Sequence, residues 1–207
     1  MYSEMLAEDM VRDPEQRREY LETLRGEADR LSRLVENVLS FSAGPRARSG
    51  VPVEETDLGG VVEDVVQAFG PLADARDARL EVRIADGCRV RASRGAVHQV
   101  LTNLLDNALK YGPEGQTVTV LGESSDGLVR IRVCDGGPGV PPAERDRVWA
   151  PYHRLPRDVM GDVQGSGIGL AVVARLVDEH GGRAWVDSAD EGGCFVIEMP
   201  ASSPGEG

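Results

Sequence analysis

A seam of apolar residues is the first regular pattern along the chain. Its members recur at alternating steps of three and four, at Leu21, Leu24, Ala28, Leu31, Val35 and Val38. This spacing predicts one amphipathic helix that starts after the capping residue Asp13 and ends near Phe41. We expect the helix to pack in a bundle or coiled coil, although a helix lying on the core of its own domain has the same spacing.

The residues on either side of this helix suggest how the chain is divided. Residues 2–11 predict a further piece of helix, the end of a partner helix in a hairpin. Residues 43–52 contain glycine, proline and arginine without apolar periodicity, which is typical of a linker. We therefore expect a helical segment at 1–42, a linker at 43–52, a folded domain at 53–200 and a disordered tail at 201–207.

Strands and helices alternate beyond the linker. Short apolar runs predict strands at 53–56, 80–84, 89–91, 117–122, 128–134, 183–188 and 194–199. Helical spacing predicts helices that begin at Asp57, at about Ser93 and at about Ser166, whereas 136–165 is rich in glycine and proline. This order, with a hairpin turn at Asp126 and Gly127, favours a two-layer α/β sandwich in which helices cover one face of a mixed sheet.

Composition excludes several classes of protein. The net charge of -12 opposes the phosphate backbone, so we expect no nucleic-acid partner. No apolar run approaches the length of a membrane span, and the N-terminus does not have the order of a signal peptide, so we expect a cytoplasmic protein. The cysteines Cys88, Cys134 and Cys194 form no C-x-x-C pair, and we expect all of them to be reduced thiols.

The helix expected at 93–111 contains an unusual polar stripe. Asn103, Asn107 and Lys110 are spaced by four and three, so they share one face. Asparagine is a poor helix former, a carboxamide oxygen is a suitable ligand for Mg²⁺, and lysine supplies a charge for phosphate oxygens. The stripe indicates a phosphate and metal site, although a solvated helix face has the same pattern.

Two glycine-rich segments follow. Asp135 ends a predicted strand and is followed by Gly136, Gly137 and Gly139, and the run Gln164-Gly165-Ser166-Gly167-Ile168-Gly169-Leu170 opens a predicted helix. Glycines at a helix N-terminus let the backbone approach a phosphate. Neither the dinucleotide fingerprint nor the P-loop fits these glycines, since the third glycine of the first and the Gly-Lys-Ser/Thr of the second are missing.

Taken in order, these segments resemble the N, G1, F and G2 boxes of the GHKL ATPase/kinase superfamily, in its histidine-kinase form. The resemblance covers about Val53 to Pro200 and implies the Bergerat ATP-binding fold. The preceding helix resembles the second helix of that family's dimerisation hairpin. Residues 1–42 would then be a partial hairpin that forms a homodimer.

The resemblance implies roles for the residues that match its boxes. Asp135 would accept a hydrogen bond from the adenine amino group, and Tyr111 would lie against the base. Asn107, assisted by Asn103, would hold Mg²⁺ and the phosphates of ATP, and Lys110 would add charge. The other nucleotide-binding residues that it implies are Gly137, Gly139, Gly165, Ser166, Gly167, Ile168, Gly169 and Leu170.

The F box would form a lid over the triphosphate. Trp149, Pro151, Tyr152 and His153 correspond to it, with Arg154 reaching the terminal phosphate. In the water-activating members of the superfamily a glutamate general base stands at the position of Asn103. Asparagine cannot take a proton at neutral pH, so the sequence favours a kinase over a gyrase-like, chaperone-like or mismatch-repair ATPase.

Two features depart from the family pattern. Cys194 replaces the usual threonine of the late Gly-Ser-Thr-Phe stretch, which would weaken a hydroxyl contact near the adenine. The phospho-accepting histidine is missing, because His98, His153 and His180 all lie in the ATP-binding segment and none fits the acceptor pattern. We expect the acceptor just upstream of Met1, together with any sensor segment that contacts a membrane.

The function implied is that of a protein histidine kinase of a two-component system. It would transfer the γ-phosphate of Mg-ATP to a histidine outside this chain, and the phosphate would pass to an aspartate of a response-regulator receiver domain. Two alternatives remain open. One is an anti-sigma-type serine kinase of the same superfamily, and the other is a catalytically inactive ATP-binding module that dimerises.

Overall fold

The computed structural model describes residues 13, 16–18, 20–21, 54–160, 166–187 and 192–202. The chain divides into two units, Met1–Arg46 and Ala47–Gly207. In the first unit, residues 16–18 and 20–21 are helical, and the N–H of Arg17 donates to the carbonyl oxygen of Asp13 over 2.9 Å. The rest of the predicted apolar seam and the predicted linker at 43–52 lie outside the described residues, so both stay predictions.

The second unit is built on a five-stranded mixed sheet. Its strands, in spatial order, are β2 (Arg79–Ile84), β4 (Thr117–Ser125), β5 (Leu128–Asp135), β7 (Gly193–Pro200) and β6 (Arg183–Asp187). The pair β2 and β4 is parallel, and the other neighbours are antiparallel. Two short strands, β1 (Glu55–Asp57) and β3 (Arg89–Arg91), form a separate antiparallel ribbon.

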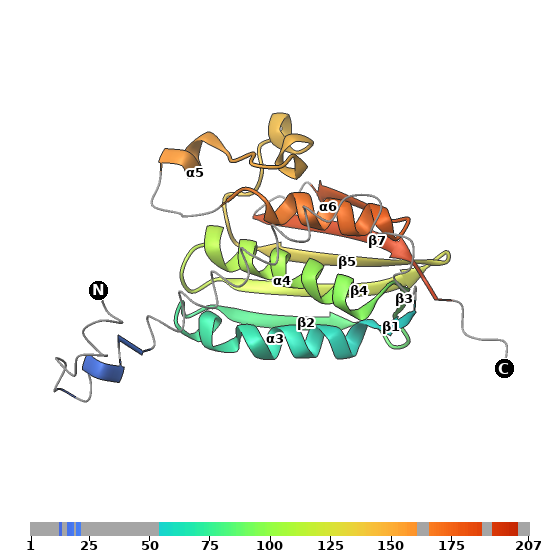
Figure 1. Ribbon diagram of the computed structural model, residues 1–207, viewed down its shortest axis with the longest axis horizontal. Helices are drawn as coiled ribbons and strands as arrows, with labels where there is room; N and C mark the ends of the chain where they lie inside the picture. The colour runs from blue at the N-terminus through green and yellow to red at the C-terminus, as the bar shows by residue number, and fades with distance from the viewer. Residues whose placement is uncertain are drawn as a thin grey trace. The chain divides into compact units, whose positions relative to one another are not determined.

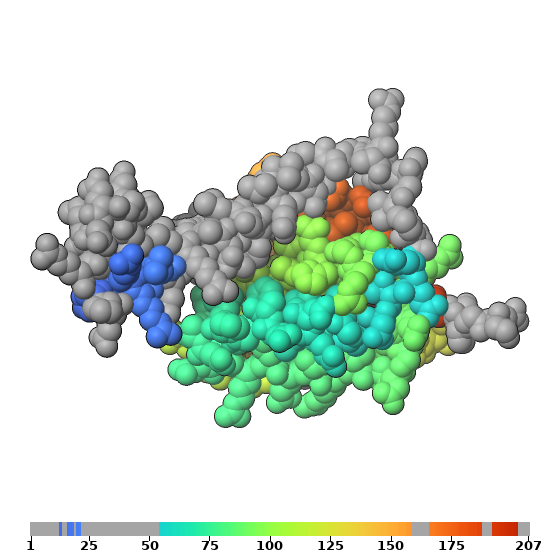
Figure 2. Space-filling view, turned by 60° about the horizontal axis from the view of Figure 1, so that its bottom comes forward, coloured from blue at the N-terminus to red at the C-terminus, as the bar shows by residue number. Residues whose placement is uncertain are grey.

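Helices cover one face of the main sheet, as Figure 1 shows. They are α3 (Leu58–Asp74), α4 (Arg94–Tyr111) and α6 (Gly169–Glu179). The side chain of Asp57 accepts the N–H of Gly60 at the start of α3, and Ser93 accepts the N–H of Ala96 at the start of α4. On the surface α3 and α4 lie side by side (Figure 2). The predicted α/β sandwich is therefore confirmed.

The core lies between these helices and the inner face of the sheet. Alternate residues of β4 and β5 point inward, as the 0% exposure of Val118, Val120, Val129 and Ile131 shows. The largest fully buried side chains include Leu58, Leu101, Leu104, Leu105, Leu109, Ile131, Ile197 and Met199. The apolar face of α4 is thus fixed against the sheet, which leaves its polar stripe to face elsewhere.

Turns account for the boundaries of several elements. Asp126 and Gly127 have φ of 55° and 74°, as a two-residue hairpin between β4 and β5 requires, so the predicted hairpin is confirmed. Helix α6 begins three residues later than Ser166, because Gly167 has a φ of 70° that no helix adopts. The stretch 136–165, predicted to be irregular, contains the short helices η2 (Pro142–Glu144), η3 (Arg147–Trp149) and α5 (Pro156–Met160).

The described chain continues past the predicted end of the domain. The N–H of Ala201 donates to the carbonyl oxygen of Gly127 over 2.8 Å, and the N–H of Ser202 donates to that of Arg89 over 2.8 Å. These two residues are therefore paired and do not belong to the tail predicted at 201–207. Residues 203–207 lie outside the described residues.

The prediction of reduced thiols is wrong for two of the cysteines. Cys134 on β5 faces Cys194 on β7 directly across the antiparallel ladder, and the two are joined by a disulfide with their Cα atoms 4.1 Å apart. Cys88 is a free, buried cysteine. The sequence separation of 60 residues gave no sign of this register, which only the pairing of the strands determines.

The outer face of the sheet bears charged residues in place of a second helical layer. Glu198 is 4% exposed, and its carboxylate accepts hydrogen bonds from Arg130 over 2.8 Å and from Arg183 over 2.7 Å. These hydrogen bonds lower the pKa of Glu198. In the part of the chain that the structure describes, no helix has the length and apolarity needed to cross a membrane.

Candidate functional site

The polar stripe of α4 faces the start of α6. Asn103 is 7% exposed, and its Nδ2 donates to the carbonyl oxygen of Gln99 over 3.0 Å. A Cβ atom built on Gly169 would lie 3.2 Å from Oδ1 of Asn103, so the amide oxygen points at the first residue of α6. Asn107 follows one turn later on the same face of α4. The polar stripe and the second glycine-rich segment, which were predicted separately, are thus brought together here.

The C-terminal end of α4 is held by side chains from other elements. The Leu109 carbonyl oxygen accepts a hydrogen bond from Nη1 of Arg76 over 2.6 Å. The Nζ atom of Lys110 lies 4.8 Å from the centre of the Tyr111 ring. Burial raises the pKa of Tyr111, and the nearby guanidinium of Arg154 opposes that effect in part. Lys110, Tyr111 and Arg154 therefore gather at one end of the helix.

The loop after β5 packs against this same end of α4. Asp135 is the last residue of β5, and its Oδ1 accepts the N–H of Gly137 over 2.8 Å. A Cβ atom on Gly137 would lie 3.3 Å from the carbonyl oxygen of Tyr111 and 3.4 Å from Cα of Gly112, so a larger residue would push the loop away. Similarly, a Cβ atom on Gly139 would lie 2.5 Å from the carbonyl oxygen of Gly192.

The carboxylate of Asp135 lies in a partly desolvated position. Burial raises its pKa, while hydrogen bonds from the N–H groups of Gly137 and Gly193 and the charge of Arg157 lower it in part. Besides these two N–H groups, the carboxylate can accept a further hydrogen bond, which suits an exocyclic amino group. Cys194 and Cys134 point to the opposite face of the sheet, because neighbouring residues alternate along a strand. The expected effect of Cys194 on a contact near Asp135 is therefore not supported.

Helix α6 begins without a capping side chain. Ile168 occupies the N-cap position and makes no side-chain cap, while Oγ of Ser166 accepts the N–H of Ile168 over 3.4 Å. The first N–H groups of a helix have no partner within it, and with the helix dipole they favour an anion. Leu170 packs on the core, so its contribution is to hold this helix start in place. Gly165 lies outside the described residues.

The aromatic segment lies against the glycines that precede α6. The N–H of Tyr152 donates to the carbonyl oxygen of Gly167 over 2.9 Å, and Tyr152 is 68% exposed. Nε2 of His153 lies 2.8 Å from Oε2 of Glu144. Trp149 packs edge-on against Phe195, with ring centres 5.9 Å apart. The segment is thus anchored by Trp149 and His153, while Tyr152 faces solvent.

Arg154 contacts the far end of α4 as well as its own segment. Its Nη2 donates to the carbonyl oxygen of Asp158, and its side chain also interacts with the hydroxyl of Tyr111. Arg154 was expected at a terminal phosphate, whereas Asn103 and the start of α6 lie two helical turns of α4 away from Tyr111. In the structure Arg154 is therefore at the Tyr111 end of the candidate site.

One residue of this region, Gln116, matches none of the motifs in the sequence. Gln116 is 6% exposed and hydrogen-bonds both to α4 and to the loop after Asp135. A glutamine directly before an apolar strand gives no signal in the sequence. Only the contacts reveal that it lies between two of the predicted motifs.

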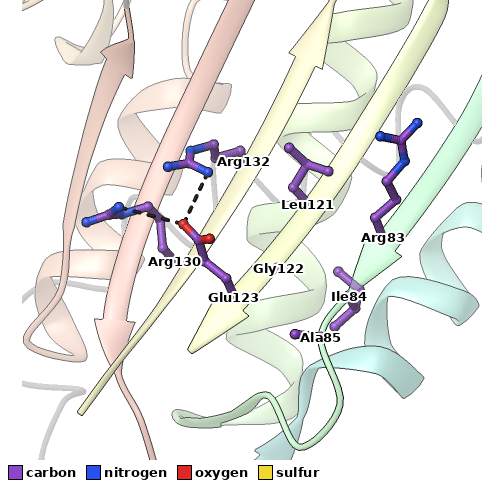
Figure 3. A pocket seen from close by; sticks show the side chains of 8 residues that line it. All are labelled: Arg83, Ile84, Ala85, Leu121, Gly122, Glu123, Arg130 and Arg132. Atoms are coloured by element: carbon purple, nitrogen blue, oxygen red, sulfur yellow. Dashed lines mark ion pairs between the residues drawn. The ribbon is translucent and has the colours of Figure 1, made fainter. Parts of the chain in front are cut away.

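A hollow on the outer face of the sheet is separate from this site. Figure 3 shows its lining, which comes from the ends of β2, β4 and β5 and includes Arg83, Arg130 and Arg132. Glu123 pairs with Arg132 over 3.1 Å and with Arg130 over 3.7 Å. None of the residues singled out in the sequence lines it. Its arginines are already occupied by acidic neighbours.

Two family models match the chain. The model described as histidine kinase-, DNA gyrase B- and HSP90-like ATPase matches residues 92–203. The model described as His Kinase A (phospho-acceptor) domain matches residues 1–44. The first match includes α4, the loop after β5 and the start of α6.

Curated relatives are named as sensor proteins and sensory kinases. The sensor protein PfeS of Pseudomonas aeruginosa is 32% identical over 199 residues, which are 96% of this chain and 43% of the relative. The sensor protein IrlS of Burkholderia pseudomallei is 31% identical, with 86% of this chain and 38% of the relative covered. The adaptive-response sensory kinase SasA of Synechococcus sp. is 38% identical, with coverage of 71% and 39%. The chain spans less than half the length of these relatives.

Solved structures agree in fold. The mycobacterial sensor histidine kinase MprB is 31% identical with a TM-score of 0.62, over 72% of this chain and 97% of that one. Full-length ShkA in complex with AMPPNP is 29% identical with a TM-score of 0.71, over 91% of this chain and 39% of that one. Together with the match over 92–203, these likenesses show that the chain belongs to the family of histidine kinase-, DNA gyrase B- and HSP90-like ATPases.

Proposed function

We propose that this chain is the ATP-dependent catalytic region of a protein histidine kinase in a two-component signalling system. It binds Mg-ATP and transfers the γ-phosphate to a histidine, from which an aspartate of a response-regulator receiver domain takes it. Both family matches and the sensor-kinase names of the relatives support this proposal. The observation that carries it is the meeting of α4, the loop after Asp135 and the uncapped start of α6.

Adenine binds at the Asp135 end of the site. The Asp135 carboxylate accepts the amino group of the base, and the Tyr111 ring lies along the base because both residues border the loop at Gly137. The triphosphate extends from the Tyr111 end, where Lys110 adds positive charge, toward Asn107, Asn103 and the N-terminus of α6, whose uncapped N–H groups favour an anion. The structural neighbour ShkA, solved in complex with AMPPNP, supports nucleotide binding by a domain of this fold.

Magnesium binds through Asn107 and the phosphates. The described residues contain no group of three or more histidine, cysteine or acidic side chains that could hold a metal ion by themselves. A single amide oxygen from Asn107 together with phosphate oxygens suits Mg²⁺, which keeps several waters and usually takes one or two protein ligands plus substrate phosphates. When bound, the ion would neutralise charge on the phosphates, while Asn107 would hold it beside Asn103.

The aromatic segment closes the site. The hydrogen bond between Tyr152 and Gly167 couples the segment to the start of α6, so movement of one moves the other. The glycines at 137 and 139 in the loop after β5, and at 165, 167 and 169 before and at the start of α6, let the backbone of these two segments approach the nucleotide. Arg154 leaves its contact with Tyr111 to reach the terminal phosphate when the segment closes.

Asn103 decides which reaction follows. Its amide cannot act as a general base at neutral pH, so water is not activated and the γ-phosphate remains available for an incoming nucleophile. Positioning and charge stabilisation are then the contributions of the site. This favours phosphoryl transfer to a protein over hydrolysis.

The accepting histidine lies outside residues 1–207. The segment matched by the phospho-acceptor model, 1–44, contains none of the histidines of the chain. His180 is engaged by the backbone of Leu176 over 2.7 Å, and His153 is paired with Glu144. We further propose that 1–42 is part of a dimerisation hairpin, that 43–52 links it to a catalytic domain at 53–200, and that the seam from Leu21 to Val38 forms a homodimer.

Nucleotide binding by the purified chain tests the site. ATP affinity should be lost in Asn107→Ala and in Asp135→Ala, and removal of Mg²⁺ with EDTA should weaken binding in the unchanged chain. His98→Ala serves as the control, because His98 is exposed on α4 outside the polar stripe. Undiminished ATP affinity in both site variants would refute the assignment.

Transfer to an added acceptor hairpin tests the reaction. The chain is incubated with radiolabelled ATP, the hairpin and a receiver domain, and the chemical stability of the product is measured. Acid-labile label on the hairpin, passed on to the receiver, is the expected result. Acid-stable label would favour a serine kinase, and binding without transfer would favour an inactive nucleotide-binding module.

A further inference from the structure

Gln116 forms a buried bridge between the two motifs of the candidate site. It precedes β4 and is 6% exposed, so its amide has no access to water that could satisfy it. Its Nε2 donates to the carbonyl oxygen of Ala108 in the last turn of α4 over 2.9 Å. Its Oε1 accepts the N–H of Gly136 in the loop after β5 over 2.9 Å.

The chemistry of the two partners suits a carboxamide. The Ala108 carbonyl oxygen, which also accepts the N–H of Gly112, takes a second donor, the N–H of Gly136 takes an acceptor, and glutamine presents one of each from a single planar group. Gly136 directly follows Asp135, and Ala108 directly follows Asn107. The bridge therefore joins the backbone next to the adenine acceptor with the backbone next to the metal ligand.

Gly112 makes room for this bridge. It ends α4 with a φ of -80°, which any residue adopts, so its backbone conformation gives no reason for a glycine. A Cβ atom built on it would overlap the amide of Gln116. Since that amide is the movable end of a side chain, a residue with a Cβ at 112 would displace it from both of its partners.

We infer that Gln116 is a positioning residue for nucleotide binding: it fixes the carboxylate of Asp135 relative to the polar stripe of α4. The inference rests on the proposed function of that site. Gly137 depends on the same arrangement, because its N–H orients Asp135 while a Cβ atom built on it would lie 3.4 Å from Cα of Gly112. Without the bridge the loop is free to shift along the end of α4. The Asp135 carboxylate is then no longer held at a fixed distance from the side chains of the polar stripe.

The test compares two nucleotides that differ at the amino group of the base. Binding of ATP and of purine riboside triphosphate, which lacks the 6-amino group, is measured on the full 207-residue chain. The unchanged chain should prefer ATP about tenfold, the effect expected of one hydrogen bond to a charged group. If it binds neither nucleotide, or binds both alike, the proposed site fails and the inference fails with it.

Gln116→Met is the main variant, since methionine has a similar length but forms neither hydrogen bond. We expect its preference for ATP to fall to about twofold or less, because Asp135 is no longer held in register. Gly112→Ala attacks the same contact from the other side and should give the same loss of preference. The double variant should be no worse than either one alone, as expected of two lesions in one contact.

Thr56→Val is the matched control. Thr56 lies in the β1–β3 ribbon, away from the candidate site residues. It is 3% exposed, and its hydroxyl donates to the carbonyl oxygen of Ala92 over 2.6 Å. This variant should lose thermal stability to a similar extent and keep the full preference for ATP. The inference is overturned if Gln116→Met and Gly112→Ala both keep the preference of the unchanged chain while their unfolding midpoints fall like that of Thr56→Val.

Discussion

Gly193 faces Asp135 directly across the β5–β7 ladder, so closely that a Cβ atom on Gly193 would lie 3.0 Å from Oδ2 of Asp135. The N–H of Gly193 also donates to that carboxylate. We therefore expect Gly193→Ala to push the carboxylate out of place and to weaken ATP binding at least tenfold, or about 1.4 kcal/mol. Isothermal titration of ATP into the variant measures this loss.

Gly70→Ala is the control for this substitution. Gly70 lies in α3 with no atom near the position of an added Cβ, so ATP affinity should not change. An unchanged affinity in Gly193→Ala would mean that the Asp135 carboxylate does not contact the nucleotide.

Gly167 couples the aromatic segment to α6, and it cannot be replaced without strain. Its φ of 70° costs a residue with a Cβ about 1 kcal/mol, and the added atom would lie 2.8 Å from the backbone carbon of Tyr152. We expect Gly167→Ala to lower the rate of phosphoryl transfer at saturating ATP, even where urea unfolding shows that the variant is fully folded. Single-turnover transfer to an acceptor hairpin and urea unfolding separate the two effects.

A second alanine provides the comparison. Gly95 lies in the first turn of α4 with open space around it, so Gly95→Ala should be neutral or slightly stabilising and should transfer phosphate normally. Equal transfer rates in Gly167→Ala and Gly95→Ala would show that the Tyr152–Gly167 contact does not contribute to phosphoryl transfer.

The elements of the domain could be predicted from local patterns. Asp57 and Ser93 cap α3 and α4 where the sequence indicated, and Asp126 with Gly127 closes the predicted hairpin. These are interactions between residues near in sequence, and the side chains alone determine them. The late start of α6 also has a local cause, the positive φ of Gly167, which a glycine permits but does not reveal.

The contacts that join the motifs could not be predicted in this way. The disulfide partners and the two partners of Gln116 depend on strand order and on the register of β5 with β7. Register is set by packing over the whole sheet, so one sequence contains it only implicitly. Family resemblance named Asn103, Tyr111 and Asp135 together, but it gave neither the bridge that links them nor the present contact of Arg154 with Tyr111.

The Cys134–Cys194 disulfide should stabilise the sheet. It closes a loop with a sequence separation of 60, for which the loss of chain entropy in the unfolded state amounts to about 4 kcal/mol at most. A double variant with alanine at both positions should unfold at lower urea than the oxidised chain. Reductant should lower the midpoint of the unchanged chain and leave that of the double variant unaltered.

Alkylation under denaturing conditions checks the same bond. The chain, unfolded without reductant, should take up label at Cys88 only, because Cys134 and Cys194 are paired. Label at every cysteine, together with unfolding that does not respond to reductant, would contradict the disulfide.

Asp135 should make the nucleotide site a source of instability at neutral pH. Burial raises its pKa above the ordinary value of 3.8, so the folded state holds the proton more tightly than the unfolded state. A group with a raised folded pKa contributes its full stability below the unfolded value and loses it as the pH rises through the folded value. Asp135→Asn, which can still accept the N–H of Gly137, should therefore be more stable than the unchanged chain at neutral pH, and this advantage should shrink as the medium is acidified.

ATP affinity should rank the two proteins the other way at neutral pH, with the unchanged chain binding ATP more tightly than Asp135→Asn. The reason is that only the ionised carboxylate accepts the amino group of adenine without a competing donor. Urea unfolding and ATP titration of both proteins from acidic to neutral pH provide the two curves. A stability difference that does not vary with pH, or an unchanged chain that is the more stable at neutral pH, would show that desolvation of Asp135 is not the controlling effect.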